Sequence, residues 1–280
     1  MLLGYMYVPL LKSVQYSFFE FREFRPDSFV GLTHYIHVFQ DGLFWNSVSL
    51  TLKWVVLTAL LPSVFGLILA LLIEYSGTGR VLAGVTRTIL FMPMMMSLVA
   101  VGLLWMLIFN PNLGLINALL NALSITDPGH PVNLFGNVRY ALFSAFIPVL
   151  WQGSGFAMVI FSAALQSLPL EIREASVIDG ANKLRQIRSI VLPYIARTVI
   201  IVMTVNMIGG FKAFDLLKVL TAGGPASSTE ITALYMYRIG FFSFRFGYSS
   251  AIAVILFVFV CGSVLGFVRV TDALYRRYEH

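Results

Sequence analysis

The stretch LQSLPLEIREASVIDGANKLRQIRSIVLP, at residues 165–193, is the most informative part of the chain and sets its organisation. Pro169 interrupts the apolar run that precedes it, because proline lacks the N–H group that a helix uses. Good helix formers with one apolar face follow over residues 170–178, which predicts a short helix. Gly180 tolerates a positive φ and marks a turn. A basic amphipathic helix is predicted over residues 181–190, so the stretch forms a helix–turn–helix between two apolar segments.

Composition places this element in an integral membrane protein. The sequence is 58% hydrophobic and 11% charged, with a mean hydropathy of +0.84, whereas soluble domains carry about a quarter charged residues. The formal net charge of +6 does not indicate nucleic-acid binding, because the basic residues are scattered through loops between apolar segments. Cys261 is the single cysteine, so no disulfide framework is predicted. His34 and His37 are expected on the surface, and without an evident third ligand they predict no metal site.

Hydrophobic runs predict an all-α fold with six transmembrane helices. A spanning helix needs about 20 mostly apolar residues, and four uncharged stretches satisfy this requirement: residues 54–73, 88–126, 140–170 and 246–268. The helix of the second stretch is expected to end near residue 110, where Asn and Pro interrupt the apolar pattern. A fifth span is predicted over residues 193–220, where Lys212, Asp215 and Lys218 recur at a spacing that puts them close to one helical face. The apolar run within residues 1–19 is too short for a whole span, which fits an interfacial segment or a helix whose beginning is missing.

The distribution of positive charge predicts the orientation, because cytoplasmic loops carry the excess of Lys and Arg. Ten basic residues belong to one set of loops: Arg80, Arg87, Arg173, Lys183, Arg185, Arg188, Arg197, Arg269, Arg276 and Arg277. Five belong to the opposite set: Arg22, Arg25, Arg139, Arg238 and Arg245. The segment 171–197 and the C-terminus are therefore expected in the cytoplasm. Alternation then makes residues 1–19 a real span of a multi-pass membrane protein.

The stretch quoted first is more specific than an ordinary interfacial loop, because it resembles the EAA loop of ABC importer permeases. That pattern runs Glu-Ala-Ala, three residues, Gly, nine residues, Ile, one residue, Leu-Pro. The matching positions are Glu174, Ala175, Gly180, Ile190, Leu192 and Pro193, with Asp179 and Ala181 matching the version of the sugar importers. Two positions depart from the pattern: Ser176 replaces the second alanine, and Ile187 stands where sugar permeases often carry an aromatic residue.

Other segments extend this resemblance over nearly the whole chain and point to the MalF/UgpA-like sugar permease family. The similar segments are YVPL at residues 7–10, VGLTHY at 30–35, TAGGP at 221–225 and FGYSSA at 246–251. The resemblance implies a single permease domain over residues 1–280, with a cytoplasmic coupling loop at residues 166–193. It also implies that the first helix is N-terminally incomplete.

The resemblance implies a mechanism and a set of partners. In that family the short helix of the loop docks in a cleft of a cytoplasmic ATPase, and ATP-driven closure of two ATPase subunits switches a pair of homologous permeases. An extracytoplasmic solute-binding protein delivers the solute. Glu174 is then the expected charged contact, Ala175 and Ala181 allow close approach, and Asp179 and Gly180 set the turn. ATP and Mg²⁺ belong to the partners, and this chain is expected to bind no cofactor and to be no enzyme, since it has no Gly-Lys dipeptide and hence no P-loop.

The WQGSGF stretch at residues 151–156 is the leading candidate for the solute path. It places aromatic, polar and glycine residues inside an otherwise apolar span, where glycine permits close approach. In maltose-type permeases, the stretch that this one resembles lines the pocket. Packing of small residues between helices is the alternative interpretation. The residues expected along the path are Trp151, Gln152, Gly153, Phe156, Asn206, Gly210 and Lys212.

Two other classes of function are open on the residues alone. A secondary transporter subunit would couple through intramembrane ionisable residues and internal repeats, but four of the predicted spans are uncharged. A membrane-embedded enzyme would need converging His, Asp or Glu residues near the bilayer. Within the importer interpretation, the solute is an oligosaccharide, a monosaccharide or a glycerol-phosphate-type compound. A phosphate group would need a cation in the path, for which Lys212 is the candidate.

Overall fold

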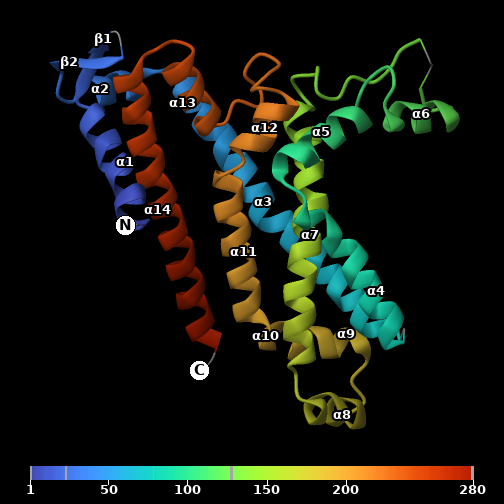
Figure 1. The fold of residues 1–280 in the computed structure, drawn as a ribbon. Helices are drawn as coiled ribbons and strands as arrows, with labels where there is room; N and C mark the ends of the chain where they lie inside the picture. The colour runs from blue at the N-terminus through green and yellow to red at the C-terminus, as the bar shows by residue number, and fades with distance from the viewer. Residues whose placement is uncertain (1, 23, 78, 127–128, 279–280) are drawn as a thin grey trace. The chain divides into compact units, whose positions relative to one another are not determined.

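A computed structural model of the chain describes residues 2–22, 24–77, 79–126 and 129–278. The protein is predominantly helical, as expected (Figure 1). Three of the described helices are long and apolar enough to cross a membrane alone: α3 (Gly42–Tyr75), α7 (Ala141–Gln166) and α14 (Phe246–Tyr278), the last over Phe246–Thr271. Two bent helix pairs bring the number to five if each pair is one span. The predicted number of six spans stays a prediction.

The chain groups into two compact units, each built from three segments. Unit 1 comprises Met1–Trp54, Gly102–Ala145 and Phe211–Ser263, and unit 2 comprises Val55–Val101, Phe146–Gly210 and Val264–His280. The boundaries fall inside helices, among them α3, α7 and α14, and not in linkers. This grouping does not define separate domains along the sequence, and the single permease domain stays a prediction.

Unit 1 holds a mixture of short and long elements around an apolar core. Its short elements are α1 (Leu2–Tyr16), β1 (Phe19–Arg22), β2 (Arg25–Phe29), α2 (Thr33–Gln40), α6 (Leu115–Ala122), α12 (Phe214–Leu220) and α13 (Thr232–Phe241), together with most of α5 (Leu98–Ile108). The core brings α2, α13 and the beginnings of α3 and α14 together through Val38, Phe44, Tyr235, Ile239, Tyr248, Ala251 and Ile252.

The β1–β2 hairpin is an addition that the all-α prediction did not contain. The strands are antiparallel, with Phe19 opposite Phe29, and the two rings meet edge to face at 5.5 Å between centroids. Such cross-strand aromatic pairs stabilise short strands that have little other cover. His34, expected on the surface, is instead buried, with its Nε2 atom 3.1 Å from the carbonyl oxygen of Phe19. Its ring therefore fixes the strand to α2.

Asp41, just before α3, is the centre of a polar cluster in unit 1. Its carboxylate accepts hydrogen bonds from the hydroxyl groups of Tyr235 and Tyr248 and, at 2.9 Å, from the backbone N–H of Leu43. Burial by itself raises the pKa of Asp41, but these hydrogen bonds stabilise the carboxylate and outweigh it, so the pKa lies below its ordinary value.

Unit 2 contains the predicted coupling loop and the helices from which it emerges. Besides the remaining parts of α3, α5, α7 and α14, its elements are α4 (Arg80–Phe91), η1 (Met92–Met95), α8 (Leu170–Ile178), α9 (Lys183–Gln186), the π turn η2 (Ile187–Val191), α10 (Leu192–Tyr194) and nearly all of α11 (Ala196–Phe211). A core joins α3, α7 and α11 to the base of the loop through Ala70, Ala157, Met158, Phe161, Leu165, Leu168, Val191, Ile195 and Val202.

The span predicted over residues 88–110 is not one continuous helix. α4 with η1 and then α5 form a pair bent by 100°. Pro93 explains the break, because it lies in the short 3₁₀ turn η1 and cannot donate the backbone hydrogen bond of an α-helix. Met96 then has extended backbone angles, which ends the turn. The uncharged run indicated apolar surroundings, but it could not indicate that the helix changes direction.

The fifth predicted span, over residues 193–220, is also interrupted. Pro193 does not open the next long helix but lies in the run Lys183–Tyr194, which meets α11 at 68°. α11 ends at Phe211, so Lys212 falls in the turn before α12. The three charges of this region therefore do not share one helix face. Lys218, on α12, places its Nζ atom 4.8 Å from the ring centroid of Tyr237, a cation–π contact.

Candidate functional site: the helical loop between α7 and α11

α8 has the bounds that its sequence predicts. Pro169 occupies the position before its first turn, where the missing N–H of proline costs nothing. At the other end, Gly180 has a φ of +73°. The backbone N–H of Gly180 donates to Val177 O at 3.0 Å and that of Ala181 donates to Ser176 O at 2.9 Å. These are the two hydrogen bonds of a Schellman motif, which satisfies the last carbonyls of α8 and turns the chain sharply.

The second half of the loop begins two residues later than predicted. Asn182 caps α9, since its side-chain oxygen accepts a hydrogen bond from the N–H of Arg185 at 2.9 Å. The helix then widens into the π turn η2, which relieves the demand for the hydrogen bond that Pro193 cannot donate. The hydroxyl group of Tyr194 donates to Ser167 O at 2.9 Å and closes the base of the loop.

Most of the surface of α8 is exposed in this chain, and Figure 1 shows it beyond the end of α7. Among the residues predicted for coupling, Ser176 is buried, Ala181, Ile190 and Leu192 are half-buried, and the exposed ones are Glu174, Ala175, Asp179, Gly180 and Pro193. Large apolar side chains are exposed beside them, with fractions between 42% and 85%: Leu170, Ile172, Val177 and Ile178. The arrangement is an exposed helix with acidic and apolar side chains, the kind of surface that binds another protein.

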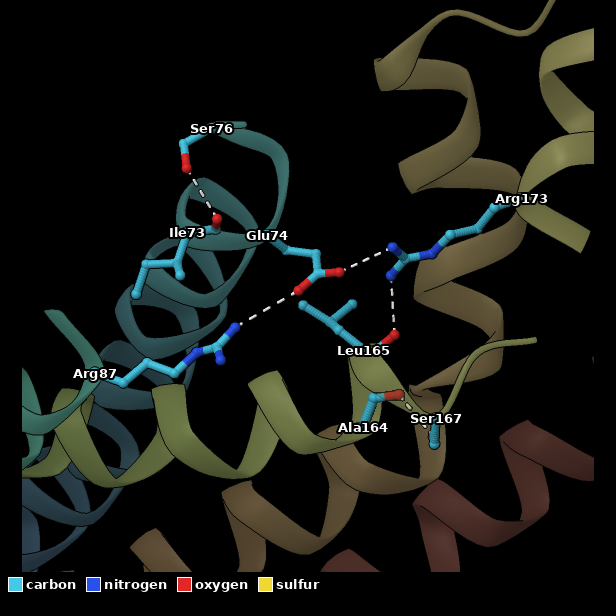
Figure 2. Close-up of polar contacts among 8 residues, drawn as sticks. All are labelled: Ile73, Glu74, Ser76, Arg87, Ala164, Leu165, Ser167 and Arg173. Atoms are coloured by element: carbon cyan, nitrogen blue, oxygen red, sulfur yellow. Dashed lines mark hydrogen bonds and ion pairs between the residues drawn. The ribbon is translucent and has the colours of Figure 1, made fainter. Parts of the chain in front are cut away.

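A charge network that the sequence did not reveal joins α8 to the ends of α3 and α7 (Figure 2). The Nη1 atom of Arg173 lies 2.8 Å from Glu74 Oε1, and its Nη2 atom donates to Leu165 O at 2.9 Å. Arg87 of α4 places its Nη2 atom 3.6 Å from the other oxygen of Glu74. The only signal in the sequence was that Glu74 and Arg87 border two uncharged runs.

Gln152 is engaged in holding the broken span. Its side-chain Nε2 donates to Pro93 O at 3.1 Å and to Met96 O at 2.9 Å. The residue is buried. Its amide adds a second donor to Pro93 O, which also accepts from the backbone N–H of Met96 at 3.2 Å, and supplies a donor to Met96 O where the helix is interrupted. Its place on a solute path, as predicted, stays a prediction, and the structure gives it a packing role as well.

Trp151 borders a cavity of about 340 Å³ in unit 2. The walls are mostly apolar and come from α3, α4, η1 and α7: Leu69, Ile89, Leu90, Met92, Pro93, Met96, Trp151, Ser154 and Gly155. The position of Met96 on this wall has no signal in the sequence. Sugars are normally fixed by convergent polar groups, and this wall offers few.

The small and polar residues predicted for the solute path make close contacts between helices. A Cβ atom on Gly153 would meet Pro62 at 3.0 Å, and one on Gly210 would meet Thr58 Oγ1 at 2.1 Å. Asn206 of α11 donates from Nδ2 to Ser63 Oγ at 2.9 Å. Of the other two predicted residues, Phe156 is half-buried and Lys212 is exposed. Lys212 belongs to unit 1, whereas the other six belong to unit 2.

Comparisons with known proteins place this arrangement in context. The model of one family, described as binding-protein-dependent transport system inner membrane component, matches residues 63–278. The trehalose/maltose transport system permease protein MalF of Thermococcus litoralis is 29% identical over 96% of this chain and 88% of the relative. The sn-glycerol-3-phosphate transport system permease protein UgpA of Agrobacterium fabrum is 34% identical over 83% of this chain and 77% of the relative.

Solved structures show the same fold. A crystal structure of a bacterial ABC transporter involved in the import of the acidic polysaccharide alginate contains a chain that matches with a TM-score of 0.81 at 21% identity, over 97% of this chain and 90% of that chain. A bacterial alginate ABC transporter in complex with alginate pentasaccharide-bound periplasmic protein contains a chain that matches with a TM-score of 0.81 at 22% identity, over 99% of this chain and 90% of that chain.

Proposed function

The chain belongs to the family of binding-protein-dependent transport system inner membrane components, and on that premise we propose that it is a permease subunit of an ABC importer for a sugar or sugar-like solute. It would move the solute across the membrane without catalysing a reaction itself. ATP and Mg²⁺ would be bound by two cytoplasmic ATPase subunits. The proposal places this chain in the inner membrane as a multi-pass protein with a cytoplasmic C-terminus.

The single observation that carries the proposal is the exposed helix α8. Pro169 precedes its first turn and a Schellman motif ends it, so residues of this chain set both of its bounds. It exposes Glu174 together with apolar side chains such as Val177 and Ile178. A helix of this kind offers a charged contact and an apolar anchor to a groove. We assign the groove to the ATPase subunit, and α8 is then the element through which ATPase closure reaches the membrane helices.

The remaining partners follow from the proposed assembly. A second homologous permease completes the translocation pathway, and an extracytoplasmic solute-binding protein delivers the solute. The structural relative in complex with a periplasmic protein supports such a delivery step. With an ATPase as the source of energy, no intramembrane ionisable relay is required of this chain, and the secondary-transporter alternative is set aside.

A sugar is the favoured solute, because the trehalose/maltose permease is similar over nearly the whole chain. A glycerol-phosphate-type solute is the second candidate, supported by the similarity to the sn-glycerol-3-phosphate permease. Lys212, exposed in the turn before α12, is the cation that such a phosphate would need. Calorimetry on the partner binding protein with trehalose, maltose and sn-glycerol 3-phosphate separates the two candidates. Binding of the phosphate compound alone would overturn the sugar assignment.

The proposal is tested by purifying the full-length protein from native membranes, as wild type and as Glu174→Arg. We expect an ATPase and a second permease to accompany the wild type, with ATP hydrolysis in the eluate, and both to be reduced for the variant. Arg185→Glu is the control and should leave both partners bound, because it reverses an exposed charge in the second half of the loop. An absence of ATPase from wild type and variants alike would contradict the importer assignment.

A further inference from the structure

α8 is held to unit 2 by few contacts, and most of them involve polar atoms. Within α8 only Ser176 is buried, and its hydroxyl group donates to the carbonyl oxygen of Arg173 in the same helix. The four large apolar side chains of α8 are exposed. The apolar core of unit 2 reaches the base of the loop through Leu168 and Val191 but includes no residue of α8. Burial of apolar surface therefore does not fix the direction in which α8 points.

Arg173 is the side chain that ties α8 to the other helices (Figure 2). Its guanidinium group donates from one nitrogen to Glu74, at the end of α3, and from another to Leu165 O, at the end of α7. The side chain of Arg173 is 27% exposed and that of Glu74 is 17% exposed. A planar fork with fixed donors sets an orientation as well as a distance, which the point charge of a lysine does not.

Glu74 extends this connection to α4. One carboxylate oxygen faces Arg173 and the other faces Arg87, so one carboxylate lies between two arginines from different helices. The amide oxygen of Gln166 accepts from Arg87 in the orientation that satisfies both groups. A parallel contact comes from the second half of the loop, where Lys183 Nζ donates to Tyr75 O at 3.2 Å. The end of α3 is thus a common point of attachment for both halves of the loop.

We propose that Arg173 is a positioning residue that holds α8 through Glu74, so that a displacement of α8 is delivered to α3 and α4 as well as to α7. Without this pair, α8 would be connected to the membrane helices by the backbone at Pro169 and by the second half of the loop. The inference rests on the proposed function for its consequence in transport. The mechanical part, that Arg173 and Glu74 fix the direction of α8, stands on geometry within unit 2 alone.

The test measures the direction of α8 in the full chain, reconstituted in lipid nanodiscs without an ATPase. Spin labels are attached to cysteines at Leu60 of α3 and Val177 of α8, both exposed, in a Cys261→Ser background. Pulsed electron resonance then gives the distribution of distances between the labels. We expect one narrow peak for the parent chain and a broad or displaced distribution for both Arg173→Gln and Glu74→Gln.

A double-variant comparison separates the pair from two independent defects. If Arg173 and Glu74 act together, the double variant is no broader than the worse single variant. Arg173→Lys, which keeps the charge and loses the fork, is expected to restore the peak in part. The control is Arg185→Gln, an exposed arginine of the same loop, which should leave the narrow peak unchanged. Narrow, unshifted peaks in both single variants, or equal broadening in the control, would overturn the inference.

The proposed function is examined separately on the same proteins. In the assembled transporter we expect Arg173→Gln to keep its ATPase, because the exposed docking surface is intact, and to move less solute per ATP hydrolysed, measured with maltose in proteoliposomes. Loss of the ATPase from wild type would contradict the proposed function and leave the distance result standing. Unchanged solute per ATP in a variant with a broadened peak would show that α8 is positioned by Arg173 but not coupled through it, and would refute the delivery to α3 and α4.

Discussion

α8 and the middle of α7 belong to the same unit but are held in opposite ways. At Gly155 the backbone of α7 approaches α4 so closely that a Cβ atom would lie 2.1 Å from Leu90 O. α8 instead exposes its apolar side chains and is tied by the polar fork of Arg173. The first region resists change through close packing, whereas the second is free to meet a partner. We therefore expect substitutions at the close contacts of α7 to lower stability, and substitutions on the exposed surface of α8 to change binding of the proposed ATPase.

The largest expected effect is on stability, from Gly155→Ala. The added methyl group collides with backbone of α4, which cannot move aside as a flexible side chain can. We expect a loss of about 3 kcal/mol in the free energy of unfolding, since overpacking of this kind costs about 1–3 kcal/mol and sometimes more. The midpoint of thermal unfolding in detergent measures it. Gly209→Ala is the matched control, because nothing lies within 4 Å of its Cβ position. An equal loss of stability in both variants would contradict the claim that close packing at Gly155 sets the effect.

Gln152→Leu tests whether the middle of α7 is packed or lines the solute path. The leucine removes the side-chain donor of Met96 O and one of the two donors of Pro93 O. We expect a loss of about 2 kcal/mol in stability, within the range for buried polar groups that lose a hydrogen bond. Gln40→Leu, at an exposed glutamine at the end of α2, should change little. A variant of unchanged thermal midpoint that no longer transports solute would instead assign Gln152 to the solute path.

Glu174→Arg tests whether α8 contributes to binding of the ATPase and not to stability. Because Glu174 is exposed, the thermal midpoint should equal that of wild type. The affinity for the ATPase should fall roughly tenfold, corresponding to about 1.4 kcal/mol, since reversal of an interfacial charge places like charges together. Titration of the permease in nanodiscs with the purified ATPase gives the affinity. A lower thermal midpoint at unchanged affinity would reverse the roles that we assign to α7 and α8.

The smallest expected effect is in unit 1, where Asp41 offers a polar contact that serves stability. Its pKa is lowered in the folded protein by hydrogen bonds from Tyr235 and Tyr248 despite burial. The ionised carboxylate therefore stabilises the fold fully at pH values above its pKa in the unfolded chain, about 3.9. This contribution is lost as the pH falls through the lower pKa of the folded protein. We expect Asp41→Asn to cost about 1 kcal/mol at pH 7. The difference from wild type should shrink at pH 3.

The control for this prediction is Asp27→Asn, which changes an exposed aspartate of β2. It should be neutral at both pH values. A difference between Asp41→Asn and wild type that grows on acidification would contradict the lowered pKa. Thermal midpoints at pH 7 and pH 3 provide the comparison for all three proteins.

The sequence predicts well those structural features that are determined by residues close together in the chain. α8 and its turn follow from Pro169, from helix formers and from Gly180, all within one short stretch. The motif that points to the family also lies there. Pro93 is a local signal for the break between α4 and α5, but the uncharged run around it fits a single span, so the break was not predicted.

What the sequence does not predict depends on contacts between distant residues. Arg173 contacts Glu74, which lies 99 positions away in the sequence, and Gln152 contacts Pro93, which lies 59 positions away. Neither pairing has a local signal, because spacing along one helix says nothing about the helix opposite. The same limit applies to the contacts of Gly210 with Thr58 and of Asn206 with Ser63. Their place on a solute path stays a prediction.

Photocrosslinking from α8 in native membranes tests most directly whether α8 is the element that contacts the ATPase. A photoreactive amino acid is placed at Ile178, which is 85% exposed, and as a control at Leu113 in unit 1, which is 92% exposed. We expect a crosslink from Ile178 to a cytoplasmic ATPase and none from Leu113, with the yield from Ile178 reduced by Glu174→Arg. A crosslink to lipid alone from Ile178, or ATPase captured equally from both positions, would contradict α8 as the coupling element.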